Sequence, residues 1–122
     1  MDEQTEQVKK FDLEDRTFDF ANNCKEFLKG INKSIHNMEY YKQLIRSSGS
    51  VAANFIEANE GFSRNDFSHR IKICRKEVKE SRLWLRLIDV SDEMEAKRSQ
   101  LIQEATELMR IFGAILEKMK IG

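Results

Sequence analysis

Apolar residues recur at alternating intervals of four and three positions along three long segments of this sequence. The three series are Leu13, Thr17, Phe20, Cys24, Phe27 and Ile31; Phe67, Ile71, Cys74, Val78, Ser81, Leu85 and Ile88; and Leu101, Ala105, Leu108, Phe112, Ile115 and Met119. In an α helix this spacing places each series on one face, as in antiparallel bundles and coiled coils. No segment keeps the period-two alternation of a strand, and proline is absent. The sequence therefore predicts an all-α fold.

The boundary between the second and third helices carries the clearest punctuation. Gly61 is suited to close a helix in a left-handed conformation. Ser63 and Asp66 resemble a capping box at the start of the next helix, and Phe62 and Phe67 are spaced for a hydrophobic staple across that cap.

Two further breaks complete the division of the chain. Gly30 through Ser34 separates the first two helices, and Ser91 or Asp92 caps the fourth. The expected helices span 13–31, 35–60, 63–90 and 92–120, and residues 1 to about 10 are expected to fray. Short connections favour antiparallel neighbours, which predicts a single domain, 1–122, folded as an up-down-up-down four-helix bundle.

Composition limits the compartment and the partners. The chain has 21 basic and 21 acidic residues, so no global field attracts nucleic acid or an anionic membrane. No apolar run approaches the roughly 18 residues of a spanning helix, and the acidic start of the chain differs from a secretory leader. Cys24 and Cys74 both fall on apolar series, as expected for buried free thiols in a reducing compartment. We therefore expect a cytoplasmic protein with no membrane partner.

Residues 43–56 are the least charged stretch, with Arg46 as their only charge and small residues all round. Two apolar series run along this helix: Met38, Tyr41, Ile45, Ser48, Ala52 and Phe55; and Tyr40, Leu44, Ser47, Val51, Asn54 and Ala58. One series can face the bundle and the other a neighbouring subunit. The oligomer interface is expected at Leu44, Ser47, Val51, Ala52 and Phe55.

Gly49 lies in the middle of this second helix, where glycine costs about 1 kcal/mol relative to alanine. Close approach of another helix would explain that cost, and a weak helix centre is the alternative.

The sequence offers no assembled catalytic or metal site. Di-metal bundles need Glu-x-x-His on two helices, whereas Asp66 and His69 show the spacing once and the paired carboxylates lack the histidine. Cys24 and Cys74 have no placed base, and no glycine-rich phosphate loop is present. We expect no metal, no cofactor and no enzymatic activity.

Three polar residues, Arg46, Asn54 and Glu57, interrupt the nearly bare second helix. If they are buried, they must be paired, because an unpaired buried charge is costly. This favours a polar network that fixes bundle or subunit register. A ligand or nucleic-acid site and simple exposure are the alternatives.

Basic residues concentrate between positions 63 and 90. This segment contains eight basic and four acidic residues, so its formal net charge is 8 − 4 = +4. Arg75, Lys79, Arg82 and Arg86 follow at spacings of 4, 3 and 4 and line one face. Such a face is commonly solvated and ion-paired, but cyclic symmetry would make it a continuous basic surface for a phosphate backbone. With only Trp84 nearby for base stacking, sequence-specific reading is not indicated.

Three ordered motifs resemble a known family. They are Gln43-Leu-Ile-Arg-Ser-Ser-Gly-Ser-Val-Ala-Ala-Asn-Phe-Ile-Glu-Ala-Asn-Glu-Gly, then Ser63-x-x-Asp66-Phe67, then Ile73-Cys-Arg-Lys-Glu-Val-Lys-Glu-Ser-Arg-Leu-Trp-Leu-Arg-Leu. They resemble the four-helix-bundle proteins encoded in 23S ribosomal RNA intervening sequences. The resemblance covers roughly the middle half of the chain; the ends match only in helical character.

The resemblance implies a homopentameric barrel of four-helix protomers. It also implies kinship with the accessory variability proteins of diversity-generating retroelements, which bind nucleic acid and a reverse transcriptase. Those relatives are notably basic, whereas this chain is neutral. The positions that match the family's signature are Arg46, Ser47, Asn54, Glu57, Glu77 and Glu80, so Glu77 and Glu80 join the expected polar network.

Two hypotheses of function follow. The first is a non-enzymatic oligomeric bundle that contacts RNA, DNA or an RNA-associated protein. The second is a purely structural or protein-binding assembly with no nucleic-acid role. The +4 charge of residues 63–90 favours the first hypothesis, and the zero net charge of the whole chain favours the second. A small-molecule or metal enzyme is a third hypothesis with the least support.

Overall fold

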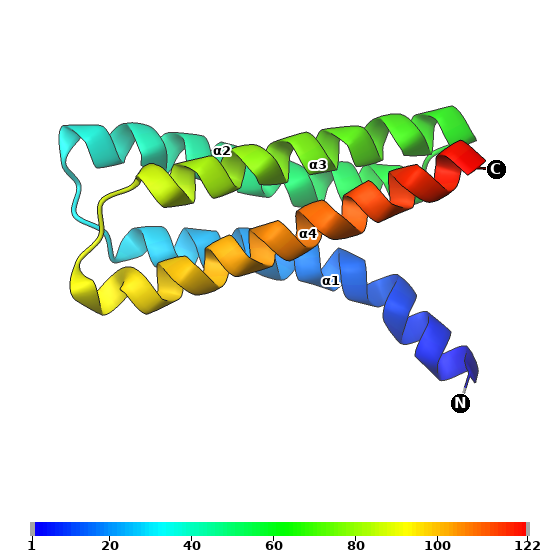
Figure 1. Cartoon of the computed structure of the whole chain (residues 1–122), viewed down its shortest axis with the longest axis horizontal. Coiled ribbons are helices and arrows are strands. Elements are labelled where there is room, and N and C mark those ends of the chain that lie inside the picture. The colour runs from blue at the N-terminus through cyan, green and yellow to red at the C-terminus, as the bar shows by residue number, and fades with distance from the viewer. Residues whose placement is uncertain (1, 122) are drawn as a thin grey trace.

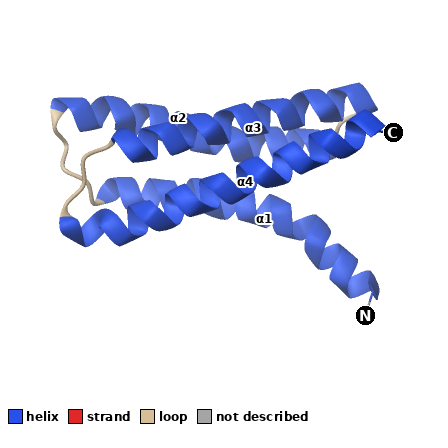
Figure 2. Cartoon of the chain, viewed as in Figure 1, coloured by secondary structure: helices blue, strands red, loops and turns tan. Residues whose placement is uncertain are grey.

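The computed structural model describes the backbone of residues 2–121 and the side chains of residues 13–120. It contains α1 (Asp2–Lys29), α2 (Ile35–Asn59), α3 (Arg64–Leu87), a short 3-10 turn (Asp92–Met94) and α4 (Glu95–Ile121). No strand occurs within residues 2–121 (Figure 2). The predicted all-α class with four long helices is therefore confirmed.

The helices lie alongside one another, with the α1–α2 and α3–α4 connections at one end and the α2–α3 connection at the other (Figure 1). The α2–α3 contact is the most extensive, and the α1–α4 contact is much smaller. Within the described residues, no helix is long and apolar enough to cross a membrane.

The helix bounds differ from the expected spans mainly at two starts. The first helix begins at Asp2 rather than at residue 13, because the apolar series marks only the buried face and the helix extends beyond it. The fourth begins at Glu95 rather than at residue 92, because Asp92–Met94 form the 3-10 turn. The side chains of residues 1 to about 10, where fraying was expected, lie outside the described residues.

The core consists of the predicted faces of α1, α3 and α4 together with one face of α2. Phe20, Cys24 and Phe27 on α1 pack with Ile71, Cys74, Val78 and Leu85 on α3 and with Leu101, Ala105, Leu108 and Phe112 on α4. Near the end of α4 the buried residue is Leu116, whereas the predicted Ile115 and Met119 are half-buried.

The second helix contributes residues to this core that the sequence had assigned to an interface. Leu44, Ser47, Val51 and Phe55 are all buried inside the chain itself, and only Ala52 is half-exposed. The interface prediction is therefore wrong for these four residues, because a side chain enclosed by its own bundle is not available to a neighbouring subunit.

Ser63 caps the start of α3 as predicted, but the second half of the capping box, a hydrogen bond from the Ser63 N–H to the Asp66 carboxylate, does not occur among the described residues. The Ser63 hydroxyl accepts a hydrogen bond from the Asp66 backbone N–H at 3.1 Å, which satisfies one of the unpaired donors of the first turn. The expected hydrophobic staple is absent, because Phe62 is fully exposed. The left-handed conformation expected of Gly61 is also wrong, since no described glycine has a positive φ. Gly61 instead donates to the Ala58 carbonyl at 3.2 Å.

Asn37 ties together the two connections at the other end of the molecule. Its side-chain amide donates to the carbonyls of Asn32 at 2.8 Å and Asp89 at 2.9 Å, and its amide oxygen accepts from the Asp89 N–H at 2.9 Å. The side chain is almost fully buried, so these bonds satisfy polar groups that water cannot reach.

Val51→Glu should destabilise the protomer by at least about 3 kcal/mol, because Val51 is fully enclosed and a carboxylate there has no partner. Thermal denaturation followed by circular dichroism should show the loss. The control is Lys79→Glu on the exposed surface, which should leave the melting temperature nearly unchanged. Equal melting temperatures for the two variants would contradict the burial of this face.

Candidate functional site

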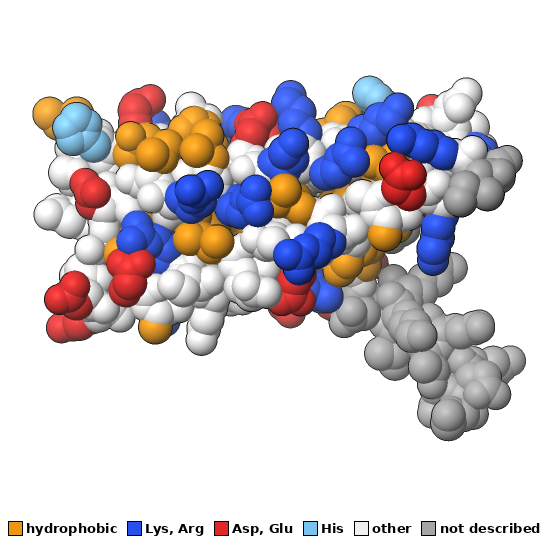
Figure 3. All heavy atoms as spheres, in the orientation of Figure 1, with side chains coloured by type: hydrophobic (Ala, Val, Ile, Leu, Met, Phe, Trp, Pro, Cys, Tyr) orange, Lys and Arg blue, Asp and Glu red, His pale blue; other side chains and the backbone are white. Residues whose placement is uncertain are grey.

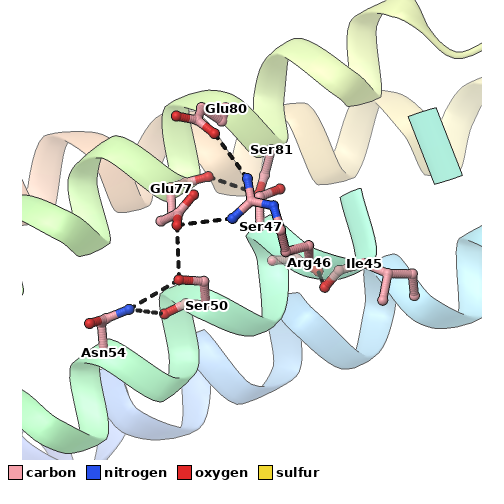
Figure 4. A network of polar contacts seen from close by, with 9 residues as sticks. Ile45, Arg46, Ser47, Ser50, Asn54, Glu77, Glu80 and Ser81 are labelled. Carbon is pink, nitrogen blue, oxygen red and sulfur yellow. Dashed lines mark hydrogen bonds and ion pairs between the residues drawn. The ribbon is translucent and has the colours of Figure 1, made fainter. Parts of the chain in front are cut away.

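A polar network joins α2 to α3 around one buried carboxylate (Figure 4). Arg46 on α2 donates from Nη1 to Glu77 Oε2 at 3.2 Å and from Nη2 to Glu80 Oε1 at 3.1 Å. The side chain of Arg46 is 52% exposed, that of Glu80 is 34% exposed and that of Glu77 is only 10% exposed. Hydrogen bonding to Glu77 raises the pKa of Arg46 above its ordinary value, so the guanidinium stays charged.

The network continues along α2 for two helical turns. The Ser50 hydroxyl donates to the same Oε2 of Glu77 at 3.0 Å. The Asn54 amide donates to the Ser50 carbonyl at 2.9 Å and to its hydroxyl at 3.0 Å. Arg70 on α3 donates to the Asn54 amide oxygen at 2.9 Å. Three side chains between Arg46 and Arg70, those of Glu77, Ser50 and Asn54, therefore link the two helices continuously.

A second, fully buried link lies beside the first. The hydroxyls of Ser47 and Ser81 are 2.7 Å apart, and Ser81 also donates to the Glu77 carbonyl at 2.9 Å. Hydroxyls can meet at this distance only where two helices approach closely, so small residues at this position have a packing role.

The structure brings together Arg46, Asn54, Glu77 and Glu80 of the predicted network and leaves out Glu57, which is exposed. Sequence reasoning missed Ser50 and Arg70. The available signal was their spacing: Ser50 follows Arg46 by one turn, and Arg70 precedes Glu77 by two turns on the same face of its helix.

One oxygen of the network has no partner. Glu77 Oε1 is buried and accepts no hydrogen bond from the described residues, while Oε2 accepts two. A desolvated carboxylate depends strongly on the donors that it has, so Arg46 and Ser50 carry most of its stabilisation.

The predicted basic series lies on the other side of α3, toward α4. Arg75, Lys79 and Arg86 are exposed and form no ion pair with the described side chains. Arg82 is half-buried and donates to Thr106 Oγ1 on α4 at 3.2 Å. Figure 3 shows Lys and Arg side chains gathered over this face of the molecule. We call Arg75, Lys79, Arg82 and Arg86 the basic face.

A third polar contact connects α1 to α4. Arg16 binds Glu104 through Nε at 3.0 Å and Nη2 at 2.6 Å, and Nη2 reaches Glu107 at 3.3 Å. These bonds, the one to Glu104 first, raise the pKa of Arg16. The pair borders a groove of about 430 Å³ between the two helices, whose floor includes Phe20 and Phe27.

The nucleophilic side chains are held in inert states. Burial raises the pKa of both Cys24 and Cys74 to about 12, so neither thiol ionises near neutral pH. The described residues contain no group of three or more His, Cys, Asp or Glu side chains that could hold a metal ion.

Comparison with known proteins identifies relatives of the whole bundle. Residues 9–114 match the family profile of the 23S rRNA-intervening sequence proteins. A crystal structure of a protein of unknown function from the S23 ribosomal protein family of Bacteroides thetaiotaomicron is 26% identical, with a TM-score of 0.74. The alignment covers 85% of this chain and 97% of that one. No curated protein matches the chain.

Arg46→Met should destabilise the protomer by roughly 1–3 kcal/mol, because it removes a donor from a carboxylate that water barely reaches. Adding Glu77→Met removes the stranded carboxylate, so the double variant should lose less stability than the sum of the single changes. Chemical denaturation of all four proteins measures this coupling. Glu57→Gln, an exposed change outside the network, should have no effect; strict additivity would show that Arg46 and Glu77 do not interact.

Proposed function

We propose that this chain, which belongs to the family of 23S rRNA-intervening sequence proteins, is a non-enzymatic protein that holds the phosphate backbone of RNA or DNA on the basic face of α3. In this proposal the protomer is an antiparallel up-down-up-down bundle, and copies assemble into a cyclic homo-oligomer. The number five comes from the resemblance to the family. The free, buried thiols support a cytoplasmic location.

The observation that carries the proposal is the segregation of charge. The whole chain is neutral, yet residues 63–90 carry +4, so the remainder carries −4. Three of the four basic-face residues are exposed without a described ion-pair partner. Cationic side chains in one row on a helix suit a polyanion whose phosphates repeat at similar intervals.

Recognition of this kind is independent of sequence, since phosphate contacts carry no base information. Trp84, the only tryptophan, is half-buried and stacks on Tyr40 with ring centroids 6.1 Å apart. It is therefore occupied inside the protomer and is not free to stack on a base.

Two observations support a non-enzymatic role. The thiols have a pKa of about 12 and are poor nucleophiles. The serine hydroxyls at 47 and 50 are tied into the α2–α3 contact, where Ser47 meets Ser81 and Ser50 donates to Glu77. These hydrogen bonds give both serine hydroxyls a structural role in the fold.

An oligomer requires an interface elsewhere than the buried face of α2. On the outer side of α2, Ile45, Gly49 and Ile56 follow at spacings of four and seven and face the same direction. Ile45 and Ile56 are exposed, and so is Phe18 on the neighbouring helix α1. Exposed isoleucines on the same side of α2 as an exposed glycine suit contact with a second copy.

The alternative function is a purely structural or protein-binding assembly with no nucleic-acid role. A specific observation favours it: Leu83 and Leu87 on α3 are both 44% exposed and stand one turn apart beside the basic face. A protein partner could bury these leucines, whereas a phosphate backbone would leave them exposed.

Replacing the basic face by glutamine at all four positions should flatten the salt dependence of nucleic-acid binding, because each lost phosphate contact removes about 0.7–0.9 from the log–log slope. Fluorescence anisotropy with a labelled RNA across a salt series provides the measurement. The matched control replaces four exposed lysines on the other helices with glutamine: Lys25, Lys29, Lys42 and Lys97. Equal slopes for the two quadruple variants would exclude the basic face, and no wild-type binding at low salt would favour the alternative function.

Gly49→Ala and Gly113→Ala form a matched pair that tests the interface. A Cβ at either position meets no atom within 4 Å in the protomer, so helix propensity favours both changes by about 1 kcal/mol. Gly113→Ala should raise the melting temperature and keep the oligomer. Gly49→Ala should weaken association in sedimentation experiments, because the added methyl separates two helices. Identical behaviour of the two variants would contradict an interface at Gly49.

A further inference from the structure

A small cavity lies where the first turns of α3 meet the last turns of α4. Its volume is about 190 Å³. Three cationic side chains line it: Arg64 and Lys72 from α3 and Lys120 from α4. Asn65 and Ser68 add neutral hydrogen-bonding groups. None of the predicted functional residues belongs to this cavity.

The charges around the cavity favour an anion. No carboxylate among the described side chains lines it. Glu117 pairs with Lys120 at 3.2 Å, but both side chains are more than two-thirds exposed, and such a pair is weak. Arg64 donates through Nη2 to the Met119 carbonyl at 2.6 Å. This bond holds the guanidinium at the mouth of the cavity and leaves its other N–H groups available.

The cavity opens onto the basic face. Lys72 lines both this cavity and a neighbouring groove of about 330 Å³. Arg75, Lys76 and Lys79 also line that groove, together with Glu80, whose carboxylate pairs with Arg46. A strand whose phosphates follow the basic face would therefore reach the cavity at Lys72. Leu116 and Met119 form apolar walls of the cavity.

We infer that this cavity, the end pocket, binds the terminal phosphate monoester of an RNA or DNA strand that lies along the basic face. The inference rests on the proposed function. A volume of about 190 Å³ is below the range of roughly 300–1,000 Å³ that encloses drug-sized ligands, and it suits one phosphate group. A monoester carries about −1.5 to −2 charges at neutral pH, against one for each backbone phosphate. The three cationic side chains that line the pocket match that excess charge.

The test compares oligonucleotides of one sequence that end in a 5′-phosphate, in a 3′-phosphate or in hydroxyls at both ends. An internal fluorophore reports binding to the protein by anisotropy. One phosphorylated form should bind roughly tenfold more tightly than the hydroxyl form, and the arm that gains affinity identifies the strand polarity. The gain should shrink as the pH falls through about 6, where the monoester takes up a proton.

Variants separate the end pocket from the rest of the surface. Lys120→Gln and Arg64→Gln should each remove most of the preference for the phosphorylated end. Both side chains are exposed, so the fold should be retained. Arg86→Gln, at the far end of the basic face, should weaken all three oligonucleotides equally and keep the preference. Melting temperatures check that each variant is folded.

The outcomes distinguish the end pocket from the basic face. Equal affinity for all three ends, with salt-dependent binding intact, would overturn the end pocket and leave the proposed function standing. A preference that survives in both Lys120→Gln and Arg64→Gln would place the terminal phosphate elsewhere. Failure of the wild type to bind any oligonucleotide at low salt would overturn the proposed function and this inference together.

Discussion

The desolvated carboxylate of Glu77 sets the arrangement of the bundle. It lies in the most extensive helix contact, and its Oε2 accepts from both Arg46 and Ser50, which are one turn apart on α2. Sliding α2 along α3 by a turn would remove one of these donors from a carboxylate that water barely reaches, at a cost of roughly 1–3 kcal/mol, which is a sizeable part of total stability. The same contact decides which way α3 faces. With Glu77 directed at α2, the basic face is rotated toward α4 and solvent, where Arg82 meets Thr106. Structural register and surface chemistry therefore depend on one ion pair.

The second helix shows where a sequence pattern is informative and where it is ambiguous. Its two apolar series, offset by one position, correctly indicated a helix with more than one apolar side. Period alone could not decide which side faces the bundle, because both series contain small and large residues in similar numbers. Burial decides it: Leu44, Val51 and Phe55 turn inward, and Ile45 and Ile56 stay exposed. The predicted interface is therefore wrong for Leu44, Ser47, Val51 and Phe55, whereas Ala52 is half-exposed. The buried residues come from both series, since Phe55 belongs to the first and Leu44 and Val51 belong to the second.

Much of the fold was predictable, because the buried faces of α1, α3 and α4 each repeat for several turns. The details that failed depend on single-residue geometry. Phe62 had the spacing of a staple, but the direction of the chain after Gly61 leaves it in solvent. Glu57 had the spacing of a network member, but its side chain is exposed and makes no hydrogen bond to the other network residues, and Ser50 takes the place beside Glu77. Spacing along one helix identifies neighbours on that helix; partners on another helix depend on its rotation, which only the three-dimensional packing determines.

Neutral net charge is a poor guide to what this surface attracts. Opposite charges cancel in the net charge, but they do not cancel locally when they are far apart. At physiological salt, screening limits the electrostatic interaction of each charged group to a range of about 8 Å. An approaching polyanion therefore meets the basic face and the end pocket before it senses the acids on other helices. A protein partner would contact the same basic side chains beside the exposed Leu83 and Leu87. A phosphate backbone needs cationic side chains that stay hydrated. A protein partner that binds the leucines needs to bury their apolar area. The end pocket lies between two helices and is lined by three basic side chains. A phosphate explains that lining, whereas an apolar partner does not.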